Sequence, residues 1–437
     1  MINALSPLDG RYEPKIQPLR MFFSEEALIK YRLIVEILYF QTLCNEKSIS
    51  DLPALKVSDR NKLDAIIENF SEVEAKKVKA IEKKTNHDVK AVEYYLKQQF
   101  EKIPALKKYK EFVHFGLTSE DVNNLAYGMM ISDALKFVVL PELKKLDADL
   151  RRLSSKWRKV SLLSLTHGQP ATPSTIGNEF AVFSDRLSKQ VNKVKSFKMD
   201  GKFGGAVGNY SAHRAAYPNV KWEALGNKFV KSLGLTPLLN TTQINPHDDI
   251  AQLSATFNLI NTILIDLSRD MWMYISRGIF KQKIIAGEVG SSTMPHKVNP
   301  IDFENAEGNL GLSNALFTHF ANKLPISRLQ RDLSDSTVQR NIGSAFGYHI
   351  ISILSLKKGL SKIMLNNKAT KKELDAHPEV YAEAIQMVLR KNNVEGAYEK
   401  LKALTRGENI SKADLLAFVD TVALPKTEKV RLKKIIG

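Results

Sequence analysis

A long apolar stripe with helical spacing is the feature that most constrains how this chain can fold. Its residues recur at spacings of 3-4-3-4-3-4-3, and they are Ile250, Leu253, Phe257, Ile260, Leu264, Leu267, Met271 and Tyr274. Such spacing places one apolar seam along a helix of about seven turns. Further apolar residues, Leu259, Ile263, Ile265 and Trp272, lie off this seam. We therefore expect the helix in the middle of a bundle or at a subunit interface.

The same periodicity recurs in two other segments, so long helices are expected to fill the middle of the chain. Apolar residues follow it between positions 143 and 160 and again between 180 and 194. Strand signals are scarce, and the two ends of the chain show shorter amphipathic stretches. The sequence therefore predicts an all-α fold with three helical regions, which are 1–112, 113–365 and 366–437.

Composition narrows the class of protein. Of the 437 residues, 43% are hydrophobic and 25% are charged, which is typical of a soluble globular chain. The 64 Lys and Arg exceed the 47 Asp and Glu, giving a net charge of +17. This excess fits a solvated lysine-rich surface, a site for anionic small molecules or nucleic-acid binding. The basic residues are dispersed without interleaved aromatic residues, so we do not expect nucleic acid as a partner.

The compartment is constrained by three further observations. Cys44 is the single cysteine, so an internal disulfide cannot form. The first residues lack the basic and apolar regions of a signal peptide. The sequence contains no run of 18 apolar residues, the length that would suggest a membrane span. We expect a cytoplasmic protein without membrane association.

Polar segments mark the ends of the expected long helices. The residues 118–121 resemble a helix start with an acidic first turn, and 245–248 resemble another. The segment 202–213 holds three glycines and is expected to be irregular. The loop 287–300 is polar and rich in glycine and proline, as expected of a mobile lid.

Most familiar catalytic templates are absent from the sequence. It contains no nucleophile-elbow, phosphate-loop, dinucleotide-binding or zinc-protease motif. The run His247, Asp248, Asp249 lacks spaced partners, which favours helix capping over a metal site. A serine of the 287–300 loop could act as a base if nearby cations and backbone N–H groups lowered its pKa. These residue types permit an elimination next to a carboxylate, but their spacing alone does not establish one.

One long motif identifies the chain by resemblance. The segment GSSTMPHKVNP (290–300) resembles the signature of the fumarase/aspartase superfamily, whose members eliminate fumarate from succinyl-bearing substrates. Within that superfamily, the chain resembles the adenylosuccinate lyase family. The supporting segments are SPLDGRY (6–12), TNHDVKAVEY (85–94), HFGLTSEDVNN (114–124), LTHGQPATP (165–173), GGAVGNYSAH (204–213), TTQINPHDD (241–249), MPHKVNPIDFEN (294–305) and QRDLSDSTVQRN (330–341).

The resemblance implies a role for four catalytic residues. Ser291 matches the base on the mobile loop, and His167 matches the general acid that protonates the departing nitrogen. Glu304 matches the carboxylate that orients this histidine. Lys297 matches a cation that binds the succinyl carboxylates and stabilises the aci-carboxylate intermediate.

Other matched positions are implied substrate contacts. Helix capping remains an alternative for Thr118 and Ser119, and a surface role remains one for Arg11. His213, His247 and His296 match family positions without an implied role, whereas His319, His349 and His377 are expected to be structural. The implied substrate-binding residues are Arg11, Tyr12, Asn86, His87, Asp88, Thr118, Ser119, Gln243, Ser292, Asn299, Arg331, Ser336 and Arg340.

The resemblance also implies an architecture and a reaction. The expected fold is a central long-helix bundle flanked by two smaller helical domains, assembled as a homotetramer with active sites shared between subunits. The expected reaction releases fumarate from adenylosuccinate, giving AMP, and from succinylaminoimidazole carboxamide ribotide (SAICAR), giving AICAR. It needs no metal or organic cofactor, because protein groups supply the acid, base and cations. Two alternatives stay open: another succinyl amine such as argininosuccinate as the substrate, and a non-catalytic helical protein.

Overall fold

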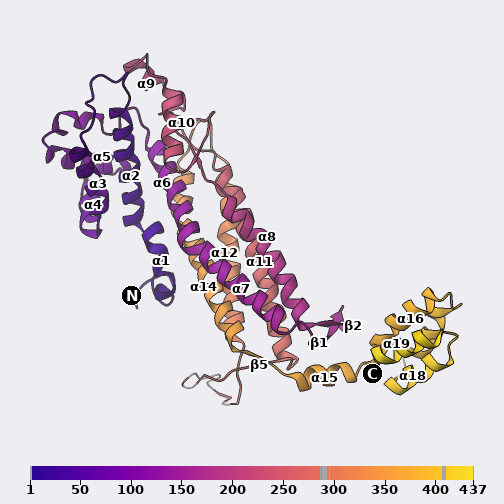
Figure 1. Ribbon diagram of the computed structural model, residues 1–437. Coiled ribbons are helices and arrows are strands. Elements are labelled where there is room, and N and C mark those ends of the chain that lie inside the picture. The colour runs from indigo at the N-terminus through magenta and orange to yellow at the C-terminus, as the bar shows by residue number, and fades with distance from the viewer. Residues whose placement is uncertain (1, 286, 288–292, 295, 406–409, 437) are drawn as a thin grey trace. The chain divides into compact units, whose positions relative to one another are not determined.

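The chain is helical over most of its length in the computed structural model, which describes residues 2–285, 287, 293–294, 296–405 and 410–436. The predicted all-α class is confirmed, since the strands there are short and form three two-stranded pairs. The chain forms two compact units (Figure 1). Unit 1 comprises 1–146, 187–268 and 304–357, and unit 2 comprises 147–186, 269–303 and 358–437.

One helix of 20 residues and several shorter ones form the N-terminal part of unit 1, and further short helices connect its long helices. Those before residue 113 are α1 (Glu13–Phe23), α2 (Glu25–Cys44), α3 (Val57–Glu68), α4 (Glu72–Thr85), α5 (Asp88–Glu101) and the 3-10 helix η1 (Lys107–Phe112). The later short helices are α9 (Ser211–Ala216), α10 (Trp222–Ser232) and α13 (Ser334–Gln339), beside the parallel pair β3 (Asp200–Gly201) and β4 (Thr236–Pro237).

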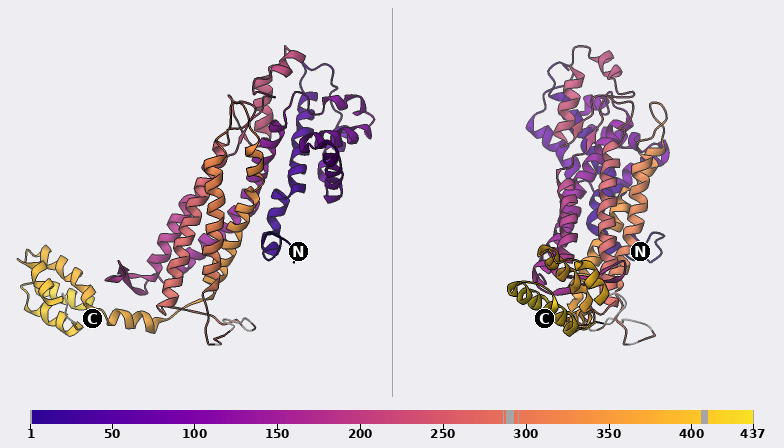
Figure 2. Two further views of the ribbon diagram at one scale, coloured as in Figure 1. Left: turned by 180° about the vertical axis from the view of Figure 1, so that it is seen from behind. Right: turned by 90° about the vertical axis from the view of Figure 1, so that its right-hand side faces the viewer.

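Five long helical segments carry the apolar stripes. They are α6 (Ser119–Ala134), continued through the π-helical turn η2 (Leu135–Val139) into α7 (Leu140–Lys156), then α8 (Ile176–Ser196), α11 (Asp248–Ser276), α12 (Ile301–Lys323) and α14 (Ile342–Lys362). The expected stripe of α11 is buried from Ile250 to Met271, and Tyr274 is partly buried. Within unit 1, α2 packs beside α6, and α11, α12 and α14 run alongside one another in both views of Figure 2.

A buried polar contact fixes how α11, α12 and α14 pack in unit 1. Asn261 Oδ1 accepts from His349 Nδ1 at 2.6 Å, and Asn261 Nδ2 donates to Ser313 Oγ at 3.0 Å. Ser313 Oγ in turn donates to the Ala345 carbonyl at 2.9 Å. Burial lowers the pKa of His349 to about 3, so the imidazole is neutral in the fold. Because each helix supplies one partner, a shift in register would leave buried polar groups unpaired.

A β-hairpin in unit 2 departs from the expectation that the chain is helical nearly throughout. It consists of β1 (Ser161–Thr166) and β2 (Gln169–Thr175), which pair antiparallel. Thr166 lies opposite Gln169, so His167 and Gly168 form a two-residue turn. Their φ angles of 54° and 74° match a type I′ turn, the turn that joins tightly paired strands. The sequence signal was only this short polar turn, and the expectation is wrong at 161–175.

The rest of unit 2 contains short helices and one more strand pair. They are β5 (Phe280–Gln282), β6 (Ile363–Leu365), α15 (Asn367–Asp375), the 3-10 helix η3 (Pro378–Tyr381), α16 (Ala382–Lys391), α17 (Ala397–Thr405), α18 (Lys412–Thr421) and α19 (Lys426–Ile436). Helices α16 to α19 share a small core around Ile385, Leu389, Leu415 and Leu432. This core explains the apolar periodicity of a segment that is otherwise highly charged.

Helix α11 alone among the described helices has the length and mean hydropathy of a membrane span. Half of its apolar window is buried within the chain. Its buried Asn261 pairs with neighbouring helices, as expected of a core helix. Leu259 and Trp272, the outermost of the residues off its seam, are exposed on this single chain.

Candidate active site

A polar pocket of about 600 Å³ lies in unit 1. Segments that are distant in the sequence meet there: the α4–α5 turn, the start of α6, the irregular stretch before α11, and α13 with the residues on either side of it. Predicted substrate contacts supply most of its lining, namely Asn86, His87, Asp88, Thr118, Ser119, Gln243, Arg331, Ser336 and Arg340. The remaining lining residues are Glu82, Asn123, Leu333 and Thr337.

The α4–α5 turn presents three of these residues because of its local backbone. Asn86 ends α4 in the left-handed conformation, with φ of 50°, which asparagine tolerates better than most residues. His87 caps α5, since its Nδ1 accepts from the Lys90 N–H at 3.2 Å. Asp88 is the first residue of α5, where a carboxylate is favoured by the helix dipole.

Asp88 is held between two arginines. Its Oδ2 accepts from Arg32 at 2.7 Å and from Arg340 at 3.0 Å. Burial alone would raise the pKa of Asp88, but the arginine charges and the hydrogen bonds from Arg32 and Val89 hold it below its usual value. Arg32 is nearly fully buried and also donates to Asn123 Oδ1 at 2.9 Å. The acidic residue therefore fixes Arg340 at the pocket wall.

The start of α6 is locked by a buried ion pair. Asp121 caps the helix by accepting from the Thr118 N–H at 2.8 Å, so the predicted helix start is confirmed. It also accepts from Lys202 Nζ at 2.6 Å, and both side chains are inaccessible to solvent. The Gly204 and Gly205 N–H groups complete its partners at 3.0 Å. This network sets the position of Thr118, the N-cap of α6, and of Ser119, its first residue.

The glycine-rich segment expected to be irregular supports another wall of the pocket. Gly208 has φ of 77°, and a Cβ there would lie 2.3 Å from the Thr241 carbonyl oxygen. Only glycine therefore allows this close approach. Gln243 donates to the Ala206 carbonyl at 2.7 Å and accepts from Arg331 Nη1 at 3.3 Å. The contact holds Arg331 at the pocket.

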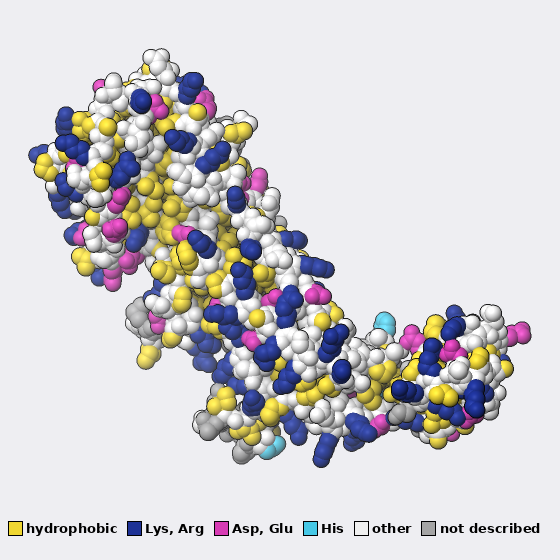
Figure 3. Space-filling model, in the orientation of Figure 1, with side chains coloured by type: hydrophobic (Ala, Val, Ile, Leu, Met, Phe, Trp, Pro, Cys, Tyr) yellow, Lys and Arg dark blue, Asp and Glu magenta, His cyan; other side chains and the backbone are white. Residues whose placement is uncertain are grey.

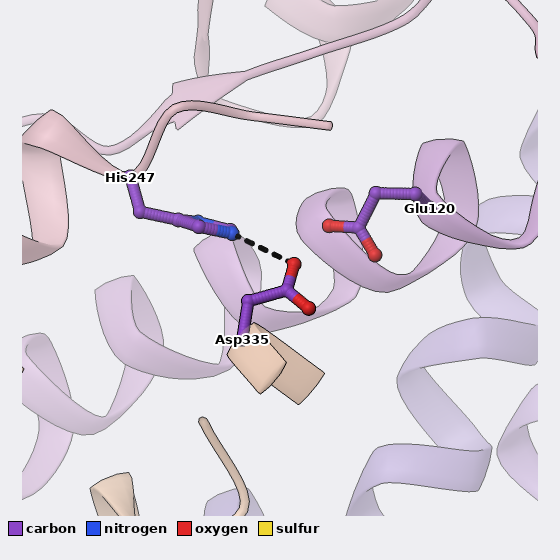
Figure 4. Close-up of side chains that lie close together, drawn as sticks. All are labelled: Glu120, His247 and Asp335. Atoms are coloured by element: carbon purple, nitrogen blue, oxygen red, sulfur yellow. Dashed lines mark hydrogen bonds and ion pairs between the residues drawn. The ribbon is translucent and has the colours of Figure 1, made fainter. Parts of the chain in front are cut away.

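Three buried titratable residues lie close together, and two of them adjoin pocket-lining residues in the sequence (Figure 4). Oxygen or nitrogen atoms of Glu120, His247 and Asp335 lie within 4.8 Å of one another. His247 Nε2 lies 3.5 Å from Asp335 Oδ2 and 3.0 Å from the Gln339 amide nitrogen. One imidazole and two carboxylates suit a divalent cation, but the amide of Gln339 already bonds the nitrogen that faces the carboxylates.

Two further histidines near the pocket segments lie in different surroundings, His114 partly buried and His213 fully buried. His114 Nδ1 bonds the inaccessible Glu36 Oε1 at 2.5 Å. Burial opposes the charged form of His114, yet the Glu36 carboxylate raises its pKa overall. His213 lies among aromatic rings, with the Trp222 ring centre 4.7 Å away, and neither of its nitrogens has a hydrogen-bond partner among the residues that the structure describes. Burial lowers the pKa of His213 to about 4.

The other predicted site residues are not brought to this pocket within the described part of the chain. His167 lies exposed at the hairpin tip in unit 2, and Lys297 is exposed in the same unit. Asn299 is partly buried, and Glu304 lies exposed on α12. Ser291 and Ser292 lie outside the described residues.

The N-terminal candidates Arg11 and Tyr12 lie in unit 1 without lining the pocket. The exposed Arg11 guanidinium lies 6.0 Å from the Tyr12 ring centre. The Tyr12 hydroxyl accepts from Asn305 Nδ2 at 3.1 Å. Burial alone would raise the pKa of Tyr12, but the Asn305 and Asn309 hydrogen bonds and the Arg11 charge lower it overall.

Reasoning from the sequence missed several residues of the site. Asn123 and Glu120 lie inside a quoted motif but were not singled out, and Asp335 directly precedes a predicted contact. Arg32 could have been found, because it is a charged residue on an otherwise apolar stretch of α2. Cys44 is buried on α2, and burial raises the pKa of its thiol to about 12.

Comparison with known proteins places the chain in a family. A family model described as "Lyase" matches residues 10–312, and one described as "Adenylosuccinate lyase C-terminal" matches residues 327–436. The adenylosuccinate lyase of Legionella pneumophila (strain Corby) is 52% identical over 434 residues, which cover 99% of this chain and 95% of that protein. The adenylosuccinate lyase of Escherichia coli (strain K12) is 51% identical over 432 residues, with the same coverage of each chain.

Solved structures of more distant proteins share the fold. The 3-carboxy-cis,cis-muconate lactonizing enzyme from Pseudomonas putida has a TM-score of 0.74 and 19% identity, covering 97% of this chain and 94% of that one. A fumarate lyase from Mesorhizobium sp. BNC1 has a TM-score of 0.74 and 15% identity, covering 96% and 94%. The matching family models and the relatives that are about half identical over nearly the whole sequence show that this chain belongs to the adenylosuccinate lyase family of the fumarase/aspartase superfamily.

Proposed function

We propose that this protein cleaves adenylosuccinate to AMP and fumarate, a step of purine biosynthesis. The observation that carries the proposal is the pocket of unit 1, which is assembled from residues that the family resemblance implies as substrate contacts. The relatives named adenylosuccinate lyase, at about 50% identity over the whole chain, support the same reaction. By family resemblance, we also propose the parallel cleavage of SAICAR to AICAR and fumarate.

The proposed mechanism is a β-elimination. Ser291 removes a proton from the succinyl carbon next to the one that bears nitrogen, leaving an aci-carboxylate carbanion. The C–N bond then breaks, its electron pair passes to nitrogen, and His167 protonates that nitrogen as AMP departs. Glu304 orients His167, and Lys297, with Asn299 and Ser292, binds the carboxylates and the developing charge. Acid, base and cations are protein groups, so we propose no metal or organic cofactor.

The pocket residues are proposed to bind the nucleotide and the succinyl group. Arg331 and Arg340 are its two arginines, and Arg331 donates to Gln243 at 3.3 Å and lies 3.9 Å from Glu120 Oε2. Thr118 and Ser119 lie at the N-terminus of α6, where the helix dipole favours a bound anion. Arg11 and Tyr12 are proposed to contact the phosphate or ribose from outside this pocket.

We propose a homotetramer whose active sites combine residues of several subunits. Helices α11 and α12 leave Leu259 and Leu312 exposed on a single chain, which supports their burial by other subunits. Shared sites would also account for catalytic residues that do not line the pocket of unit 1. We retain the division into domains 1–112, 113–365 and 366–437 as part of this proposal, together with a cytoplasmic location that the free Cys44 supports.

The test is absorbance-monitored turnover of adenylosuccinate by the purified protein, with fumarate quantified separately. Equal amounts of AMP and fumarate are expected. Ser291→Ala and His167→Ala should each lower kcat by about 10²- to 10⁴-fold without unfolding the protein. Mixing the two inactive variants under conditions that exchange subunits should restore part of the activity, because some mixed sites would contain both intact residues. Full activity in either variant would refute the assigned roles, and no recovery on mixing would refute shared sites.

The alternatives predict different outcomes. If argininosuccinate or another succinyl amine were the substrate, AMP would not compete for the site, and adenylosuccinate would not turn over. A non-catalytic protein binding nucleic acid would show salt-dependent affinity for random DNA without lyase activity. Lys and Arg side chains are dispersed on the face shown in Figure 3 rather than gathered in one patch, which favours steering of anionic substrates over that alternative.

A further inference from the structure

The buried cluster of Glu120, His247 and Asp335 holds more acidic groups than its surroundings can neutralise. These three residues are each at most 3% exposed. Two positively charged side chains face Glu120. They are Arg331, whose Nη1 lies 3.9 Å from Glu120 Oε2, and Lys202. Lys202 already pairs with Asp121 at 2.6 Å. Two ionised carboxylates would therefore be poorly compensated in a site that excludes water.

Hydrogen bonding does not remove this imbalance. Asp335 Oδ1 accepts from the Ser336 N–H at 2.6 Å, and its Oδ2 lies 3.5 Å from His247 Nε2. Glu120 Oε1 is buried and has no hydrogen-bond partner in the described part of the chain. Burial raises the pKa of Glu120 to about 7, and the Asp335 charge adds to the rise against the opposing effect of His247 and Arg331. A proton on Glu120 is the simplest way to stabilise the cluster.

The cluster is connected to the substrate pocket at three points. Glu120 follows Ser119 on α6, and Asp335 precedes Ser336 on α13, so each acid adjoins a pocket residue. Arg331 lines the pocket and is the cation that lies nearest Glu120. A negative charge on Glu120 would draw the guanidinium toward the cluster and oppose an anion in the pocket.

We propose that Glu120, His247 and Asp335 are positioning residues that keep Arg331 available to an anionic substrate, and that loss of a proton from Glu120 weakens the binding of that substrate. The proposal rests on the proposed function for the identity of the anion. By thermodynamic linkage, an anion that binds better to the protonated cluster must also promote proton uptake. Substrate affinity and proton uptake are therefore two measures of one coupling.

The first experiment is calorimetric titration of the full-length wild-type protein with AMP, at pH 6 and pH 8, in two buffers of different ionisation enthalpy. Between pH 6 and pH 8, the AMP affinity of the wild type should fall by a factor about five times larger than the factor for Glu120→Gln. A fivefold effect is the lower end of the coupling that is typical between linked sites. The wild type should take up more protons near pH 7 than Glu120→Gln does. Titration of the AMP phosphate contributes equally to both proteins, so the difference between them isolates Glu120.

A matched control and a second variant exclude a merely structural effect. Glu93→Gln replaces another buried carboxylate of unit 1, which pairs with Lys90 and Lys97 away from the pocket, and it should behave as the wild type. Asp335→Asn removes the neighbouring negative charge and should lower the pKa of Glu120. The fall in AMP affinity with pH should therefore occur at lower pH in Asp335→Asn than in the wild type. This result tests the proposal even if Glu120→Gln fails to fold.

Steady-state kinetics separate this inference from the proposed function. With adenylosuccinate, the KM of the wild type should rise with pH more steeply than that of Glu120→Gln, whereas kcat should differ less. Turnover by the wild type with identical pH profiles and proton uptake in wild type and Glu120→Gln would overturn the inference alone. Absence of turnover would refute the proposed function, and the AMP titrations would still decide the coupling. A wild type that neither turns over adenylosuccinate nor binds AMP would overturn both.

Discussion

The buried Asp121–Lys202 pair should be a dominant source of stability for the pocket wall, and Asp121→Asn tests this directly. Asp121 accepts from Lys202 Nζ at 2.6 Å and from backbone N–H groups of Thr118, Gly204 and Gly205. Neutralising one partner of a fully buried pair costs about 3–5 kcal/mol. The new amide also directs its NH₂ at a backbone donor, which adds about 1–3 kcal/mol. We therefore expect a loss of at least about 4 kcal/mol.

Urea unfolding at fixed protein concentration, followed by tryptophan fluorescence, measures this loss as a lower transition midpoint. The double variant Asp121→Asn, Lys202→Met should be more stable than Asp121→Asn alone, because it no longer buries an unpaired ammonium. AMP affinity should fall in the single variant, since the position of Thr118 depends on the Asp121 cap. An unchanged midpoint in Asp121→Asn, or additive losses in the double variant, would refute this reasoning.

Three further predictions follow from other buried groups. Because burial lowers the pKa of His213 to about 4, the neutral imidazole stabilises the fold fully above about pH 6.5, and this stability is lost as the pH falls toward 4. In His213→Phe, the urea midpoint of unfolding should therefore depend less on pH over that range. Gly116→Ala should destabilise the fold more than Gly234→Ala in the same urea assay, because both have positive φ but only at Gly116 would a Cβ lie 2.5 Å from a His213 atom. Arg32→Met should raise the KM for adenylosuccinate by about tenfold with a smaller change in kcat, because Asp88 would lose its buried partner; equal losses in both constants would contradict a role in binding.

Helices were the predictable part of this fold because their signal is local. The stripe from Ile250 to Met271 is buried as its spacing predicts, and both expected helix starts are present. The hairpin was not predictable in the same way. Its two-residue turn at His167 and Gly168 depends on positive φ angles, which the short polar sequence indicates only weakly. Pairing between strands also requires contacts that residue spacing within one segment cannot encode.

The pocket could be predicted only through resemblance. Asp88 and Arg340 are separated by 252 positions, and no periodicity in the sequence indicates that they form an ion pair at 3.0 Å. The same applies to Glu120 and Asp335, which adjoin recognised residues in the sequence and form a buried cluster with His247 (Figure 4). Motif recognition identifies the positions that are proposed to contact substrate, whereas the residues that support them depend on how separate helices pack.

The charge balance of the pocket supports the proposal that other subunits contribute groups to the active site. The charged residues that line it are Glu82, Asp88, Arg331 and Arg340, so their formal charges cancel. Arg340 is further engaged by Glu25 at 3.3 Å. Adenylosuccinate brings a phosphate of about −2 and two carboxylates, and the N-termini of α5 and α6 offer only about half a positive charge each. Additional cations are therefore required, and Lys297 with the loop around Ser291 is the proposed source. If those groups come from neighbouring subunits, separating the subunits should abolish succinyl recognition before it abolishes AMP binding.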